Sequence, residues 1–484
     1  MNFEKKENLT LLCDFYEFAM GNGYFKVGLK EKNVIFDMFF RSVPDNASYA
    51  IIAGLEQVID YMENLHFDDS DIDFLRTKGI FDEEFLKYLK NFEFKCDVWA
   101  IPEGTIAFPQ EPLVIVRGPV IQAQMLETMV LLTINHQSMV ATKANRIVNA
   151  AEGRPVVEFG SRRAQGYSGA NLGARASYIG GCLGTADTLA EKIYGVPALG
   201  TMAHSWVQLF DSELEAFRQY ARVYPDNCLL LVDTFDVLKE GVPNAIKVFD
   251  EEVVPRGFRP KGIRIDSGDI AYLSKEARKM LDKAGYRDAK IMASNSLDEW
   301  TIQNILMQGA KLDSFGVGER LITSKSSPVF GGVYKLVGIE EADGNIRPSI
   351  KISENVSKIT TPGFKNLYRI YDKKTGKAEA DLITLHDEKI DESKPIELFH
   401  PIYTWKRKTF KDYYVKPLLV QIYREGKLIY KKPTLEEIRE RAKNELDSLW
   451  DEVKRLENPH EYIVDLSQKL WEVKDTLLKE HREK

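Results

Sequence analysis

The sequence has few cysteines and no long apolar segment. Only four cysteines occur among its 484 residues, and they are widely separated, without a C-x-x-C pair: Cys13, Cys96, Cys182 and Cys228. This distribution argues against a disulfide framework or a zinc site and is typical of a reducing compartment. No run of about 18 apolar residues occurs, and the first residues lack the apolar core of a signal peptide. We therefore predict a soluble, cytoplasmic protein without a membrane span.

An excess of positive charge is also absent. The chain has 66 lysines and arginines against 73 acidic residues, a net charge of −7. This balance predicts no nucleic-acid partner, and the small basic cluster at 406–408 is typical of a solvated surface. Three common motifs are missing as well: G-x-x-x-x-G-K-[ST], G-x-G-x-x-G and G-x-S-x-G. Their absence excludes the commonest nucleotide-binding loops and the serine hydrolase elbow.

The length and composition predict several folded domains. Hydrophobic residues make up 44% and charged residues 29% of the sequence, as in ordinary globular proteins, and 484 residues exceed a single core. We predict an N-terminal α+β domain over 1–140, a catalytic α/β barrel over 141–335 and a C-terminal α+β extension over 336–484. In the extension, Thr434 followed by Glu437 predicts a capping box at the start of a helix.

Short apolar runs recur along the middle of the chain with helical patterns between them. The runs occupy residues 155–161, 198–204, 228–234, 262–269, 289–295 and 312–319. Such an alternation is typical of βα units in a barrel or a doubly wound sheet. Every run ends in small and ionisable residues, and a barrel collects all of those ends on its C-terminal face. The pattern therefore favours an irregular parallel α/β barrel.

The ends of the first two runs carry a group of polar side chains. They are Arg162, Arg163, Thr201, His204 and Ser205. In α/β folds, ligands bind at the carboxyl ends of the strands, where the loops are free to carry chemistry. These residues therefore predict an active-site edge for an anionic substrate. A histidine at a strand end is more often a hydrogen-bonded structural residue than a nucleophile. For His204 the preceding Gly200-Thr201, the neighbouring Ser205 and the arginines expected on the same face favour the nucleophile.

Later strand ends add acids and glycines. The turn at 266–269 (DSGD) suits ribose hydroxyls, or Mg²⁺ through water, although turns favour the same residues. Arg264 precedes Asp266 by two positions, so both side chains point to the same side of their strand. Asp233 could serve the sugar or a metal, or could cap the following helix. The pair Gly316 and Gly318 lets backbone N–H groups approach a phosphate. These residues by themselves support an enzyme that acts on a phosphorylated sugar.

Six blocks of sequence, in order, resemble the nicotinate phosphoribosyltransferase family. They are LLCDFYEFAMGNGYF, EFGSRRAQG, GTMAHSW, LLVDTFDV, IRIDSGD and FGVGERL. The resemblance implies a type II phosphoribosyltransferase-like barrel and a homodimer with shared active sites. It also implies the reaction of nicotinate with phosphoribosyl pyrophosphate to give nicotinate mononucleotide and pyrophosphate, a salvage step of NAD biosynthesis. ATP hydrolysis would be coupled through a phosphohistidine, with Mg²⁺ as cofactor.

The resemblance also implies a role for individual residues. Tyr16, Thr201 and Arg264 would bind nicotinate, with Tyr16 reaching into the partner's site. Phe159 would stack on the pyridine ring, although a core phenylalanine is an alternative. The remaining assignments from the resemblance are Arg162 and Arg163 for the carboxylate or the phosphates, Asp266 for the ribose, Gly316 and Gly318 for the 5′-phosphate, and His204 for phosphorylation. Ser205, beside His204, can hold a transferred phosphoryl group through its hydroxyl or its N–H.

Two positions depart from the family pattern. Cys13 stands where threonine is expected, and Glu319 stands where other members can carry threonine beside the phosphate loop. An acid repels a phosphate, so we expect Glu319 to face Arg320 or a metal ion. Two alternative functions stay open from sequence. One is a related transferase for nicotinamide or quinolinate, and the other is a metabolite-binding protein that has kept the barrel without its activity.

Overall fold

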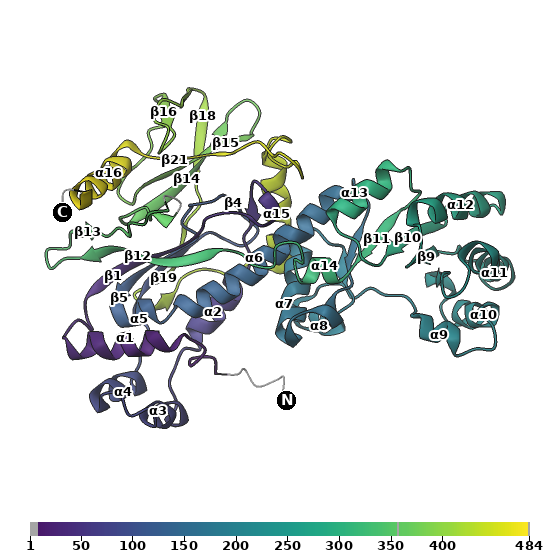
Figure 1. The fold of residues 1–484 in the computed structure, drawn as a ribbon, viewed down its shortest axis with the longest axis horizontal. Coiled ribbons are helices and arrows are strands. Elements are labelled where there is room, and N and C mark those ends of the chain that lie inside the picture. Colours follow the sequence, from purple (N-terminus) through teal and green to yellow (C-terminus); the bar gives the residue numbers. More distant parts are fainter. Residues whose placement is uncertain (1–7, 356–357, 483–484) are drawn as a thin grey trace. The chain divides into compact units, whose positions relative to one another are not determined.

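The computed structural model describes residues 8–355 and 358–482. The chain divides into two compact units (Figure 1): unit 1 comprises Met1–Met139 and Val329–Lys484, and unit 2 comprises Val140–Pro328. The borders of unit 2 lie close to those predicted for the catalytic segment, while the N-terminal and C-terminal segments pack together in unit 1. Within the described residues, no helix combines the length and apolarity needed to cross a membrane.

Unit 1 is built on an antiparallel sheet that joins both ends of the chain. Its strand order is β13-β12-β1-β5-β3-β19-β20. The strands are β1 (Asn33–Phe40), β3 (Asp97–Ala100), β5 (Val114–Pro119), β12 (Gly332–Glu340), β13 (Ile346–Pro348), β19 (Val420–Arg424) and β20 (Lys427–Leu428). Strand β1 pairs with β12, and β3 pairs with β19. These long-range pairings explain why the two ends of the chain form a single unit.

The remainder of unit 1 consists of smaller sheets and surrounding helices. A four-stranded sheet has the order β18-β14-β15-β21, and two further strand pairs are β2-β4 and β16-β17. These strands are β2 (Ala50–Ile51), β4 (Ile106–Ala107), β14 (Lys365–Asp372), β15 (Ala378–Leu385), β16 (Ile396–Phe399), β17 (Arg407–Phe410), β18 (Tyr413–Pro417) and β21 (Ile463–Leu466). The helices are α1 (Phe15–Lys26), α2 (Leu55–Glu63), α3 (Asp69–Arg76), α4 (Glu83–Lys90), α5 (Val120–Gln124), α15 (Leu435–Ser448) and α16 (Gln468–Arg482).

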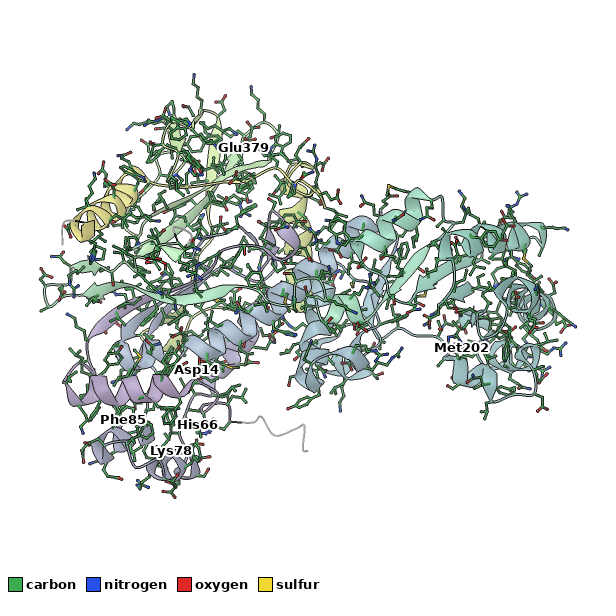
Figure 2. The ribbon with its side chains drawn as sticks, in the orientation of Figure 1. Asp14, His66, Lys78, Phe85, Met202 and Glu379 are labelled. Carbon is green, nitrogen blue, oxygen red and sulfur yellow. The ribbon has the colours of Figure 1, made fainter. Side chains whose placement is uncertain are left out.

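Two local features of these helices follow from sequence. The capping box predicted from Thr434 and Glu437 is confirmed, since each side chain accepts a hydrogen bond from the other residue's backbone N–H at the start of α15. Helix α1 packs its aromatic residues against α4: Phe25 and Phe85 have ring centroids 5.9 Å apart, and Phe85 is labelled in Figure 2. Aromatic packing of this kind contributes about 0.5–1.5 kcal/mol per pair beyond burial.

A buried ion pair lies in the core of unit 1. Asp37 on β1 lies 2.7 Å from the Nζ of Lys365 on β14, and both side chains are almost completely buried. Lys365 Nζ also donates to the carbonyl oxygens of Thr361 and Gly363, at 2.7 and 2.8 Å. Because both side chains are buried, the charge of Asp37 is compensated by Lys365, and the charge of Lys365 by Asp37 and the two carbonyl oxygens. Removing one partner leaves the other as an uncompensated buried charge.

We predict that Lys365→Met lowers the free energy of unfolding by about 3–5 kcal/mol, because Asp37 then lies buried without its cation. Chemical denaturation followed by tryptophan fluorescence measures the change. The matched control is Lys335→Met, which removes a partly exposed lysine 3.7 Å from Glu127 and is expected to cost about 1 kcal/mol or less. Equal losses in the two variants would contradict the buried-pair interpretation.

Unit 2 contains a six-stranded parallel sheet with the order β7-β6-β11-β10-β9-β8. Its strands are β6 (Val156–Glu158), β7 (Gly184–Thr185), β8 (Leu229–Leu231), β9 (Gly262–Ile265), β10 (Lys290–Ser294) and β11 (Ser314–Val317). The helices are α7 (Gly166–Ile179), α8 (Thr188–Tyr194), α9 (His204–Gln208), α10 (Glu213–Val223), α11 (Val242–Val248), α12 (Ile270–Lys283), α13 (Glu299–Met307) and α14 (Glu319–Ile322), and α6 (Glu127–Ala150) has residues in both units.

The structure confirms five of the six predicted strand runs and corrects the sixth. The runs at 155–161, 228–234, 262–269, 289–295 and 312–319 contain β6, β8, β9, β10 and β11. The run at 198–204 was predicted as a strand, and this is wrong. Ala198 forms one isolated bridge to Thr185, and α9 begins at His204. Gly200 and Ala203 are exposed, so the segment lacks the two covered faces that a strand of a parallel sheet requires.

The parallel sheet would close into a barrel only if its two edge strands, β7 and β8, also paired. β11, the last strand of the unit, pairs with β6, the first, and β8 to β11 follow one another as neighbours. No strand pairing in the described part of the chain joins β7 to β8, between which the corrected segment lies. The parallel sheet is therefore confirmed, and its closure into an α/β barrel stays a prediction.

Candidate active site

A cavity of about 220 Å³ lies in unit 2, where β6, β9, β10 and β11 end. Its lining contains five cationic side chains and two acidic ones. The lining residues are Phe159, Arg162, Arg163, Arg264, Asp266, Ser294, Asn295, Ser296, Gly316, Gly318, Glu319, Arg320 and Lys325. The excess of arginine and lysine in a confined space makes the cavity suited to an anionic ligand, because each charge is less screened there than on an open surface.

Arg264 is the most highly connected of these cations. It lies on β9, and its side chain donates to Ser294 Oγ at 2.9 Å, to Thr201 Oγ1 at 3.2 Å and to Asp266 Oδ1 at 3.1 Å. Its guanidinium carbon lies 5.4 Å from the centre of the Phe159 ring. These contacts hold the guanidinium in one orientation, which lowers the entropy cost of binding a carboxylate.

Asp266, which accepts a hydrogen bond from Arg264, also lies close to His204. His204 Nε2 lies 3.7 Å from Asp266 Oδ2, and its Nδ1 lies 3.1 Å from Thr234 Oγ1. The side chain of His204 is 40% exposed, so a ligand can reach the ring. If Nδ1 carries the proton and donates to Thr234, the lone pair of Nε2 is directed toward the acid and the solvent.

Asp233 supports the turn that carries Asp266. Its Oδ2 accepts hydrogen bonds from the backbone N–H of Asp266 at 3.1 Å and from Ser267 Oγ at 2.6 Å. Its Oδ1 is buried and has no hydrogen-bond partner among the described residues. Such an orphaned oxygen is costly, and an ion, a water molecule or a ligand hydroxyl would satisfy it.

The glycines and Phe159 form one wall of the cavity. A Cβ atom at Gly316 would lie 2.5 Å from two ring carbons of Phe159, so any side chain there would displace the ring. Phe159 itself is half-buried and lines the cavity. Gly318 follows β11 and precedes α14. The two glycines therefore leave space for the aromatic ring as well as for backbone approach to a ligand.

Glu158 anchors the start of the arginine-bearing loop. Its side chain is fully buried, and it accepts hydrogen bonds from Thr185 Oγ1 at 2.6 Å and from the backbone N–H of Gly160. Burial raises the pKa of Glu158 to about 7, while these two hydrogen bonds oppose the shift. The acid thereby joins β6 to β7 and fixes the turn that presents Arg162 and Arg163, both of which are exposed at the cavity.

Glu319 does not face Arg320, as one sequence-based expectation had it. It forms a 2.6 Å ion pair with Lys325, and this contact lowers the pKa of Glu319. Arg320 instead pairs with Asp298. The reason is local geometry: Glu319 and Arg320 are adjacent in α14, and neighbouring residues of a helix point in different directions.

The structure places most of the residues predicted from sequence at or next to this cavity. Tyr16 is the exception, since it lies on α1 in unit 1, where it is 43% exposed. Ser205 is exposed on α9 next to His204. Sequence reasoning missed five lining residues: Ser294, Asn295, Ser296, Arg320 and Lys325. Ser294 and Asn295 form the polar end of the run 289–295, which is the sequence feature that could have indicated them.

Asn295 and Ser296 have an unusual backbone conformation. Their φ angles are 78° and 49°, in the left-handed region that residues with side chains seldom adopt. Two consecutive residues of this kind store strain, which proteins retain mainly where it shapes a functional site. Their position directly after β10 allows the chain to turn sharply beside the cavity.

The sequence is similar to known proteins over most of its length. The sequence matches the nicotinate phosphoribosyltransferase N-terminal domain over residues 11–135, the nicotinate phosphoribosyltransferase (NAPRTase) family over 155–383 and the C-terminal domain over 364–474. It is 43% identical over 467 residues to the nicotinate phosphoribosyltransferase of Bacillus subtilis, which covers 96% of this chain and 94% of that protein.

More distant relatives match over a similar span. The chain is 30% identical over 517 residues to the nicotinate phosphoribosyltransferase of Homo sapiens, with 95% of each protein covered. The crystal structure of human nicotinic acid phosphoribosyltransferase superposes with a TM-score of 0.83 at 28% identity, covering 96% of this chain and 100% of that chain. Identity at these levels, over nearly the full length of both partners, establishes that the chain belongs to the nicotinate phosphoribosyltransferase family.

Proposed function

We propose that this protein joins nicotinate to the ribose of phosphoribosyl pyrophosphate, releasing pyrophosphate and forming nicotinate mononucleotide for NAD biosynthesis. We include in the proposal a coupled hydrolysis of ATP through phosphorylation of His204. The observation that carries it is the placement of Arg264 and Asp266 side by side in a cavity rich in cations. The guanidinium of Arg264 suits the carboxylate of nicotinate, and the carboxylate of Asp266 suits a ribose ring that gains positive charge.

The reaction forms one bond and breaks another at C1 of the ribose. The lone pair of the pyridine nitrogen forms the new N–C bond, and the electron pair of the C1–O bond leaves with pyrophosphate. Positive charge develops on the sugar ring, where the Asp266 carboxylate would stabilise it. Negative charge develops on the leaving group, where Arg162 and Arg163 would stabilise it. No proton moves in this step, so catalysis rests on positioning and electrostatics.

Nicotinate binding would depend on Arg264 and its neighbours. The guanidinium of Arg264 and the hydroxyl of Thr201 would bind the carboxylate, and the ring of Phe159 would lie against the pyridine. The three hydrogen bonds of Arg264 support this assignment, since they aim the group before the substrate arrives. A neutral amide at the same position on the pyridine could not neutralise the arginine.

Mg²⁺ fits this site as a partner of the substrate's phosphates. Among residues 8–355 and 358–482, no group of three or more acidic, histidine or cysteine side chains is arranged to hold a metal ion alone. Mg²⁺ commonly uses only one or two carboxylates together with substrate phosphates. Asp233, with its unpartnered Oδ1, and Asp266 would be its protein contacts. Bound there, the ion would neutralise charge on pyrophosphate.

A panel of pyridine acceptors tests the substrate. Pyrophosphate release would be measured with nicotinate, nicotinamide and quinolinate, each with phosphoribosyl pyrophosphate and Mg²⁺. We expect nicotinate to exceed nicotinamide by at least about a hundredfold in kcat/KM, because the neutral amide offers the Arg264 guanidinium no carboxylate to bind. Faster turnover of nicotinamide or quinolinate would favour a related transferase. No release with any acceptor would favour a non-catalytic binding protein.

A shared active site is proposed from the family resemblance of Tyr16. Tyr16 lies on α1 with 43% of its surface exposed, and partial burial together with a hydrogen bond to Glu127 raises the pKa of its hydroxyl. We predict that Tyr16→Ala and Arg264→Ala each have strongly reduced activity as homodimers, and that mixing them restores part of the activity through hybrid dimers. The control mixes each variant with itself. Failure to recover activity, under conditions where labelled subunits demonstrably exchange, would contradict a shared site.

A further inference from the structure

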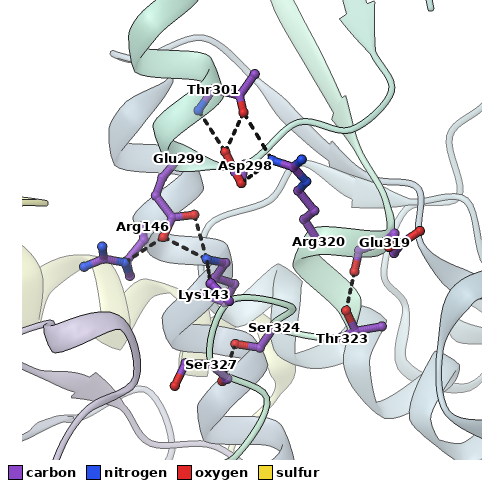
Figure 3. A network of polar contacts seen from close by, with 11 residues as sticks. Lys143, Arg146, Asp298, Glu299, Thr301, Glu319, Arg320, Thr323, Ser324 and Ser327 are labelled. Carbon is purple, nitrogen blue, oxygen red and sulfur yellow. Dashed lines mark hydrogen bonds and ion pairs between the residues drawn. The ribbon is translucent and has the colours of Figure 1, made fainter.

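Arg320 is a cavity cation to which the reaction scheme above gives no role. It lies in α14, and its Nη1 contacts Asp298 Oδ2 at 2.5 Å and Thr301 Oγ1 at 3.3 Å (Figure 3). Both contacts use the same nitrogen. The described residues offer no hydrogen-bond partner to Nε or Nη2, and the side chain lines the cavity. The guanidinium is thus held at one corner, with its other donors available to a ligand.

Asp298 is itself rigidly placed. It is the N-cap of α13, and its Oδ1 accepts hydrogen bonds from the backbone N–H of Thr301 at 2.8 Å and from Thr301 Oγ1 at 2.7 Å. Burial acts against ionisation of this acid, but the hydrogen bonds from Thr301 and Arg320 outweigh it and lower the pKa of Asp298. The carboxylate therefore uses one oxygen to cap the helix and the other to hold the arginine.

The next residue, Glu299, forms a second, buried set of ion pairs at the start of α13. Its fully buried carboxylate lies 2.8 Å from Lys143 and 2.9 Å from Arg146, both on α6. Lys143 also donates to Ser326 Oγ at 2.7 Å. The segment from 320 to 326, which includes the cavity-lining Lys325, is therefore held at one end by the contact of Arg320 with Asp298 and at the other by the contact of Ser326 with Lys143, the partner of Glu299. Figure 3 shows the two acids directed to opposite sides of this start.

We propose that Arg320 binds the phosphate groups of phosphoribosyl pyrophosphate and that Asp298 is the positioning residue that holds Arg320 in place. The proposal rests on the proposed function for the identity of the ligand. The N–H groups on Nε and Nη2 of the planar guanidinium can donate to two oxygens of one phosphate. The contact of Nη1 with Asp298 restricts the side chain before the ligand binds. Arg264 would bind the carboxylate of nicotinate. Arg320 would therefore join the other cations of the cavity in binding the phosphates of phosphoribosyl pyrophosphate.

The test compares Arg320→Gln and Asp298→Asn by calorimetric binding of phosphoribosyl pyrophosphate with Mg²⁺, without nicotinate, and by steady-state kinetics. We expect Arg320→Gln to raise both Kd and KM for phosphoribosyl pyrophosphate at least tenfold, while KM for nicotinate changes less than threefold. Asp298→Asn should raise the same Kd three- to tenfold, because asparagine keeps the helix cap but loses the ion pair. The double variant should bind no more weakly than Arg320→Gln alone.

A surface pair gives the matched control. Asp288 forms an ion pair with Arg259 in the same unit, and both side chains are 55% exposed. Asp288→Asn should leave the Kd for phosphoribosyl pyrophosphate unchanged. Arg320→Lys should recover little of the lost affinity, because an ammonium group cannot contact Asp298 and also present two parallel donors to a phosphate. A merely structural role for the pair would lower thermal stability without selectively changing this Kd.

Each outcome separates this inference from the proposed function. If the wild type forms nicotinate mononucleotide and Arg320→Gln binds phosphoribosyl pyrophosphate normally, the inference is overturned and the function stands. If the wild type binds this ligand, Arg320→Gln does not, and no acceptor is turned over, the function fails and the inference stands. Lack of wild-type binding overturns both. An unchanged Kd in Asp298→Asn overturns the positioning role.

Discussion

Arg264→Ala is expected to lower kcat/KM for nicotinate by about thirty- to five-thousandfold. Truncating one partner of a desolvated, hydrogen-bonded charge pair costs about 2–5 kcal/mol, and each 1.4 kcal/mol is about a factor of ten. Here the loss includes the substrate carboxylate left unpaired and the contacts of Arg264 with Ser294 and Asp266. Initial rates of pyrophosphate release, at saturating phosphoribosyl pyrophosphate, measure the effect.

Arg259→Ala is the matched control for this substitution. Arg259 is an exposed arginine of the same unit that pairs with Asp288, away from the residues that line the cavity. It should retain wild-type kcat/KM within about twofold. A loss of less than tenfold in Arg264→Ala, with thermal stability unchanged, would show that Arg264 does not bind the nicotinate carboxylate.

The second large effect is expected for His204. Incubation of the wild type with γ-labelled ATP and Mg²⁺ should transfer label to the protein in an acid-labile, base-stable linkage. His204→Ala should abolish the label and the stimulation by ATP. The attacking atom is Nε2, provided that Nδ1 donates to Thr234, and neutral imidazole is nucleophilic near pH 7. The P–O bond to ADP breaks as the P–N bond forms.

Slow synthesis without ATP should persist in His204→Ala, since the departure of pyrophosphate needs no histidine. The control is His66→Ala, which replaces an exposed histidine of unit 1 and should leave labelling unchanged. Label that survives in His204→Ala would place the phosphorylated residue elsewhere. Stimulation by ATP that survives in the same variant would separate ATP hydrolysis from this side chain.

Much of unit 2 could be predicted because parallel strands have a simple signature. Runs such as 228–234 and 262–269 have apolar cores and end in polar residues, so the apolar residues locate the strands and the polar ends locate the site. The run at 198–204 looks similar in sequence but contains glycine and alanine at exposed positions. Whether this run forms a strand depends on its being buried by the rest of the fold, and the fold leaves it exposed.

The residues that sequence missed lie where no local rule applies. Asn295 and Ser296 both adopt left-handed conformations; asparagine tolerates this region, but nothing in the sequence predicts it for the serine that follows. Arg320 reaches the cavity through a contact with Asp298, 22 positions away in the chain. Neither the strained turn nor the long-range ion pair leaves a periodic pattern. The family resemblance covered substrate contacts but not Asp298, the acid that holds Arg320 in position.

The most direct test of the central claim is a single assay of the wild-type protein. Nicotinate, phosphoribosyl pyrophosphate and Mg²⁺ would be incubated with and without ATP, and pyrophosphate and nicotinate mononucleotide would be quantified together. The account predicts one pyrophosphate from phosphoribosyl pyrophosphate for each nicotinate mononucleotide formed, with faster formation when ATP is present. Absence of nicotinate-dependent pyrophosphate under both conditions would contradict it.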